Sequence, residues 1–79
     1  MAIKNPRNPY RNLSALLLGS ARVKWNGETF ERWAAATGIS DSTLRRRIQR
    51  PETIELGELR RMAAAAEVEP EQLIAALPL

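Results

Sequence analysis

The sequence predicts an all-α domain of five short helices. Apolar residues make up 44% of the 79 residues, which is enough for a single compact core. Aromatic residues make up only 5%, so this core must consist mainly of Leu, Ile, Val and Ala side chains. Stretches rich in Ala and Leu with few β-branched residues favour helix over strand. Apolar residues spaced three and four apart divide the chain into five helical segments.

The first twelve residues are predicted to form a flexible basic arm, so the folded domain is expected to span residues 13–79. Pro6 and Pro9 interrupt any helix in this segment, and its three Asn residues favour turns. Two interpretations of the arm stay open: plain disorder, and an arm that enters a DNA groove.

The first helix is expected over residues 13–25, where six residues follow the helical spacing. They are Leu13, Leu16, Leu17, Ser20, Val23 and Lys24. Asn26 and Gly27 are expected to end this helix, because Gly readily adopts the left-handed conformation that follows a helix C-terminus.

Two further helices are expected over residues 30–37 and 41–49, joined by a short turn. Thr29 is the predicted N-cap of the first and Ser40 of the second, because their hydroxyl oxygens can accept hydrogen bonds from free backbone N–H groups. Gly38 opens the turn, since it adopts a positive φ without a Cβ clash.

Small and apolar residues fit the inner positions of this helix pair. Ala34 must be small because the two helices cross close to it. Ile39, Leu44 and Ile48 anchor the second helix on the core, which leaves its other face free.

The last two helices are expected over residues 56–67 and 70–77. The predicted inward residues of the first are Leu56, Leu59, Met62, Ala63 and Ala66. Glu69 followed by Pro70 is a helix-start signal, because Pro suits the first helical position.

Charge is divided unevenly along the chain. Residues 1–50 contain ten Lys and Arg against three acidic residues, a net charge of +7, whereas residues 51–79 have a net charge of −4. A basic side is the electrostatic footprint of a protein that binds a polyanion. Charges that only solvate helix faces would give the same count.

The composition argues against an enzyme. The chain has no Cys and no His, which removes disulfides, the usual zinc ligands and the usual general base. No nucleophile–base pair or Gly-rich phosphate loop is visible, so neither a metal nor a cofactor is expected. The sequence shows no signal peptide and no apolar run long enough to cross a membrane, so no membrane partner and a cytoplasmic location are expected.

The stretch TFERWAAATGISDSTLRRRIQ, residues 29–49, has the pattern of two helices joined by a tight turn. With TIELGELRRMAAAAEVEPEQL after it, the chain from about residue 13 to 77 resembles the five-helix DNA-binding domain of lambda repressor-like and Cro-like (Xre-type) helix-turn-helix regulators. The resemblance implies a sequence-specific regulator of transcription that binds double-stranded DNA. It also implies a phage or bacterial repressor that binds a short palindromic operator as a homodimer.

The resemblance further implies which residues contact DNA. The residues expected to read bases are Asp41, Ser42, Arg45, Arg46 and Gln49. Those expected to contact phosphate are Thr29, Phe30, Ser40, Thr43, Arg50 and Thr53. Arg46 is the first choice for a bidentate contact to guanine. Asp41 could instead orient Arg45, and the hydroxyl groups at 40, 42 and 43 could instead cap the helix.

Four positions stand apart from the family pattern or from the expected DNA contacts. Phe30 stands where the family often has Gln, so its side chain is expected to cover the core edge rather than brace the third helix. Glu67 replaces a Gly, which suggests a less regular turn, and Gly57 replaces a charged residue. Arg47 is expected to reach only phosphate or solvent.

Two other functions stay open. A protein-interaction module on the same fold, such as an antitoxin or a virus-encoded inhibitor, would use the acidic-to-apolar fifth helix as its partner surface. That helix, together with residues 77–79, is also the expected contact between the two copies of a dimer. Trp25 and Trp33 are expected either in the core or in a dimer contact. RNA binding is disfavoured, because few aromatic side chains are available to stack on unpaired bases.

Overall fold

A computed structural model describes residues 8–78, which form α-helices and one short 3-10 helix and contain no strand. The elements in order are α1 (Arg11–Lys24), α2 (Thr29–Thr37), α3 (Asp41–Gln49), η1 (Pro51–Thr53), α4 (Leu56–Ala65) and α5 (Pro70–Ala76). The expected all-α class is confirmed. Most of the predicted arm, and the last residue of the expected dimer contact, lie outside the described residues.

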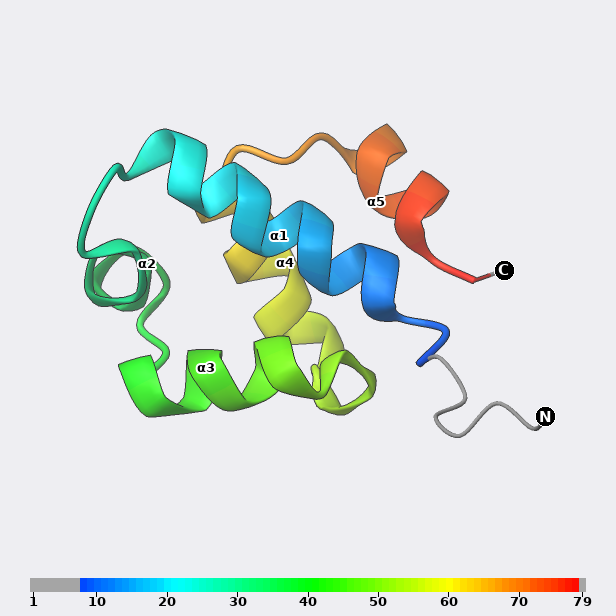
Figure 1. The fold of residues 1–79 in the computed structure, drawn as a ribbon, viewed down its shortest axis with the longest axis horizontal. Helices are drawn as coiled ribbons and strands as arrows, with labels where there is room; N and C mark the ends of the chain where they lie inside the picture. The colour runs from blue at the N-terminus through cyan, green and yellow to red at the C-terminus, as the bar shows by residue number, and fades with distance from the viewer. Residues whose placement is uncertain (1–7, 79) are drawn as a thin grey trace, which may run out of the picture.

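The helices pack around α1 and α4. In Figure 1, α3 and α5 lie on opposite sides of α1, and α1 contacts both of them. Helix α4 contacts α1 and α2 from behind, and α2 also contacts α3. The arrangement places α3 at one edge of the molecule, away from α5.

The core takes one large side chain from each of the first four helices. Leu17, Trp33, Leu44 and Met62 are completely buried. The indole N–H of Trp33 donates a hydrogen bond to the carbonyl oxygen of Met62 (3.1 Å), so burying this polar group leaves no donor unpaired. The expectation that Trp33 belongs to the core is confirmed, and Trp25 is half-buried at its edge.

Helix α1 begins two residues before its predicted start. The side-chain oxygen of Asn8 accepts a hydrogen bond from the backbone N–H of Tyr10 (2.8 Å), and the Asn8 carbonyl accepts one from Arg11 (3.0 Å). This local turn starts the helix, so Arg11 and Asn12 belong to α1 rather than to the predicted arm.

Two apolar residues that follow the predicted helical spacing are exposed. The buried residues of α1 are Leu13, Leu17 and Ala21. Val23 follows Ala21 by two residues and therefore lies on the opposite side of the helix, where it is 86% exposed. Leu56 is 84% exposed, since the first residue of α4 lies at the edge of that helix's inward face. Helical spacing identified these helices but not the exact width of their buried stripes.

The turn after α4 is regular, contrary to expectation. The helix ends at Ala65, and the N–H groups of Glu67 and Val68 donate to the carbonyl oxygens of Ala64 (3.2 Å) and Ala63 (2.9 Å). These two bonds form a Schellman motif. Glu67 adopts the left-handed conformation (φ 60°) in which Gly is usual.

Candidate nucleic-acid interface

Helix α3 packs on the core through one face and exposes the opposite face. Leu44 is completely buried and Ile48, one turn later, is half-buried against the core. These two side chains fix α3 on the body of the protein. Four of the five sequence-predicted base-reading residues are exposed on the other side and form what we term the outward face: Ser42, Arg45, Arg46 and Gln49. The fifth, Asp41, is half-buried at the start of the helix.

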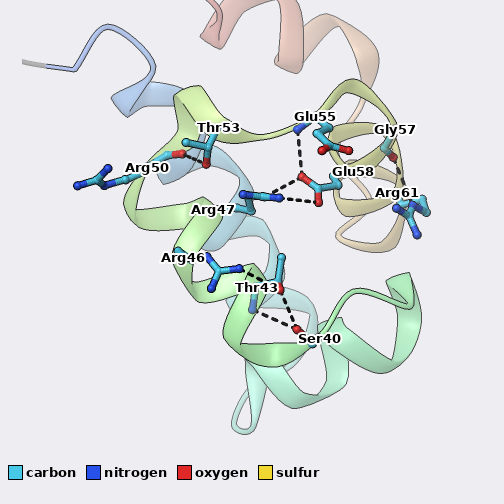
Figure 2. Close-up of polar contacts among 10 residues, drawn as sticks. All are labelled: Ser40, Thr43, Arg46, Arg47, Arg50, Thr53, Glu55, Gly57, Glu58 and Arg61. Carbon is cyan, nitrogen blue, oxygen red and sulfur yellow. Dashed lines mark hydrogen bonds and ion pairs between the residues drawn. The ribbon is translucent and has the colours of Figure 1, made fainter.

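The predicted N-cap of α3 is confirmed. The hydroxyl oxygen of Ser40 accepts a hydrogen bond from the backbone N–H of Thr43 (3.2 Å) and donates to the Thr43 hydroxyl (2.9 Å). Figure 2 shows both contacts at the start of the helix. Capping was one of two roles left open for these hydroxyl groups, and the Ser40 hydroxyl has this role, whereas the Thr43 hydroxyl accepts a hydrogen bond from Ser40.

The turn between α2 and α3 is held from both sides. Gly38 has the predicted positive φ of 76°, and the Thr37 hydroxyl accepts a hydrogen bond from the N–H of Ile39 (3.1 Å). From α4, a terminal nitrogen of Arg61 donates to the carbonyl oxygen of Thr37 (3.2 Å), and its Nε donates to that of Gly57 (3.4 Å). Arg61 therefore ties the end of α2 to α4, a role that the sequence did not indicate.

The predicted N-cap of α2 is wrong. Glu28, with a left-handed φ of 53°, precedes the helix, and Thr29 is its first residue. The Thr29 hydroxyl donates back to the carbonyl oxygen of Trp25 (2.8 Å), and no side chain caps this helix end. An open hollow beside it is lined by Arg22, Glu28, Thr29, Phe30, Glu31 and Arg45. Two Arg and two Glu balance the formal charge there.

Phe30 packs against the core edge beside Trp33, as expected, but it also contacts α3. The guanidinium carbon of Arg45 lies 4.4 Å from the centroid of the Phe30 ring, a cation–π distance. The Nε of the same Arg45 donates to a carboxylate oxygen of Asp41, one turn earlier on α3. Asp41 thus adopts the role of orienting Arg45, one of the two that the sequence left open.

The other exposed residues at this edge are held less closely. Arg46 has one long hydrogen bond, from a terminal nitrogen to the Thr43 hydroxyl (3.4 Å). Arg50 extends away from the end of α3 (Figure 2). Thr53 in η1 donates its hydroxyl to the Arg50 carbonyl (2.7 Å), which fixes the backbone of the loop.

Arg47 points inward rather than to phosphate or solvent. Its Nε and Nη2 donate to the two carboxylate oxygens of Glu58 on α4, at 2.8 and 3.2 Å (Figure 2). The Glu58 oxygen nearest to Nε also accepts from the backbone N–H of Glu55 (3.0 Å). The hydrogen bond from Arg47 holds the pKa of the Glu58 carboxyl below its ordinary value and raises the pKa of Arg47. This pair joins α3 to α4.

The charge division seen along the sequence is weaker in space. Glu58 pairs with Arg47, and Glu67 pairs with Lys24 of α1. Glu52 accepts a hydrogen bond from the side-chain amide of Asn8, which lowers the pKa of its carboxyl. Half of the acidic residues after position 50 therefore contact residues 1–50, two of them in ion pairs. The outward face of α3 keeps two exposed Arg side chains.

Within residues 8–78, no cluster of three or more Cys, His, Asp or Glu side chains could hold a metal ion. None of the described helices is both long and apolar enough to span a membrane. Comparisons with protein-family models, with characterised proteins and with solved structures find no match.

Proposed function

We propose that the protein binds double-stranded DNA sequence-specifically by placing α3 in the major groove. The observation that carries this proposal is the outward face of α3, whose polar side chains are exposed while Leu44 anchors the opposite face. A major groove admits one α-helix, and the hydrogen-bonding edges of base pairs suit these residue types. Arg pairs with guanine and Gln with adenine through two hydrogen bonds each.

The helix pair α2–α3 supports a helix-turn-helix of the lambda repressor type. The two helices are joined by three residues that begin with a left-handed Gly38, and α1, α4 and α5 occur in the order of that five-helix domain. On this proposal, the start of α2 at Thr29 and Phe30 and the loop at Arg50 and Thr53 lie beside phosphates.

We further propose a phage or bacterial repressor that acts as a homodimer. One short helix offers little interface for tight binding, whereas two copies would place their helices in successive major grooves about 34–36 Å apart. Helix α5 suits the contact between copies, because it lies across α1 from α3 and 61% of Ile74 is exposed on it.

Selection of binding sites from random duplex DNA tests the proposal. We expect a short inverted repeat, and binding that weakens steeply with salt, with a slope of about −0.9 in log affinity per neutralised phosphate. Arg46→Ala should weaken binding to the selected site. Arg60→Ala is the matched control, because it removes the same charge from an exposed position on α4.

The rival function is a protein-interaction module such as an antitoxin or a viral inhibitor. Exposed Val23 on α1 and Ile74 on α5 favour it, because exposed apolar residues suit a protein contact. Selection of no duplex at any salt concentration would contradict DNA binding and leave this rival in its place.

A further inference from the structure

Arg45 is constrained by residues on two different helices. Asp41 of α3 accepts a hydrogen bond from its Nε, and the ring of Phe30 on α2 lies 4.4 Å from its guanidinium carbon. Within the described residues, Nη1 and Nη2 of Arg45 have no recorded hydrogen-bond partner, and the side chain is 60% exposed. The guanidinium group is thus held at Nε and against the Phe30 ring, while its other two nitrogens stay available.

This arrangement matters because a free Arg side chain loses much rotamer entropy when it binds. An Arg side chain has many rotamers, and immobilising it in one of them has an entropic cost. A side chain already held in one geometry loses less, so more of its hydrogen-bond energy appears as affinity. Two neighbouring nitrogens of a guanidinium match the O6 and N7 acceptors of guanine in the major groove.

Arg46 lacks comparable support. Its recorded hydrogen bond is the long one to Thr43, at 3.4 Å, and no aromatic ring stacks on it in the described part of the chain. The sequence favours Arg46 as the guanine contact. Of the two residues, however, Arg45 is the one that side chains on two helices hold in place before DNA binds.

We propose that Arg45 reads a guanine in the major groove, and that Phe30 and Asp41 are positioning residues that hold it for this contact. The inference rests on the proposed function and deepens it. In a purely structural interpretation, Phe30 covers the core edge and Asp41 stabilises α3 by an ion pair. Loss of either residue would then change stability but leave the preferred base unchanged.

The experiment repeats the selection from random duplex DNA with four variants. Arg45→Ala should reduce the preference for guanine at one position of each half-site by roughly 5- to 150-fold. Phe30→Leu, which keeps an apolar side chain, and Asp41→Asn should each reduce it at the same position, by roughly 2- to 30-fold for loss of the ring contact. Glu67→Gln is the control, because it removes a carboxylate from another exposed ion pair, with Lys24 of α1, and should leave the preference unchanged.

A double-mutant cycle separates positioning from stability. If Phe30 acts through Arg45, adding Phe30→Leu to Arg45→Ala should cause no further loss of base preference. Phe30→Tyr keeps the ring and should retain the preference, with melting temperatures measured for every variant. Additive losses, or an unchanged guanine preference in folded Arg45→Ala, would overturn the inference while DNA binding by the wild type stands. Absence of any selected duplex for the wild type would overturn both proposals.

Discussion

Arg47 and Glu58 join α3 to α4 through two parallel hydrogen bonds between charged groups. The Arg47 side chain is only 20% exposed and that of Glu58 only 11%, and the Glu58 carboxylate also accepts a hydrogen bond from the backbone N–H of Glu55. A charge with little access to water is stabilised by its partner and is costly without it. The pair therefore helps to fix α3 on α4 without occupying the outward face.

Glu58→Gln should lower the melting temperature by several degrees. The substitution keeps the shape of the side chain but leaves the Arg47 guanidinium without its counter-charge. Thermal unfolding followed by circular dichroism measures the effect. Glu71→Gln on α5 is the matched control, because its side chain is exposed and should tolerate the change. Equal melting temperatures for the two variants would show that the ion pair contributes nothing.

The contribution of Glu58 should depend on pH at the acidic end. Because Arg47 lowers its folded-state pKa, the stabilisation is complete above the unfolded value of about 4.3 and is lost as pH falls through the folded value. The difference in unfolding free energy between wild type and Glu58→Gln should hence be constant from pH 5 to 7 and shrink below about pH 4. Denaturant titrations across this range measure it. A difference that grows on acidification would contradict the assigned sign.

Ser40→Ala should destabilise the protein by about 1 kcal/mol, because α3 loses its side-chain N-cap. Ser42→Ala removes the same hydroxyl from a residue that does not cap the helix, so its unfolding free energy should stay within a few tenths of the wild-type value. Urea unfolding compares the two. Similar losses in both variants would argue against capping by Ser40.

Glu67→Gly should stabilise the protein by up to about 1 kcal/mol. The left-handed conformation costs a residue with a Cβ about 1–2 kcal/mol, and the exposed ion pair with Lys24 offsets only part of that. Glu67→Ala loses the same ion pair but keeps the strain, so it should be no more stable than wild type. Equal stability of the Gly and Ala variants would rule out backbone strain at this position.

Local signals in the sequence predicted the helices and several of their ends. Ser40 and Gly38 act as predicted, because capping and positive φ depend on neighbouring residues alone. Thr29 is not the cap because the helix begins one residue earlier than predicted, at Thr29 itself, and its hydroxyl donates to the carbonyl of Trp25 instead.

The contacts that fix the candidate interface were harder to predict. Glu58 lies 11 residues from Arg47 along the chain, and Phe30 lies on a different helix from Arg45. Such pairs depend on how the helices cross, which periodicity does not give. Two features of the sequence are consistent with the Arg47–Glu58 pair. Arg47 follows buried Leu44 by three residues and so lies beside the buried face of α3. Glu58 follows Glu55, the residue before α4, by three, which is the spacing of a capping box.

Titration of isotope-labelled protein with its selected duplex, followed by amide chemical shifts, tests DNA binding by α3 most directly. We expect the largest shifts at Ser42, Arg45, Arg46 and Gln49 and at the start of α2. Amides in the middle of α4 serve as the internal reference. Shifts confined to α1 and α5, or no shift on addition of duplex, would contradict the proposal that the outward face of α3 binds DNA.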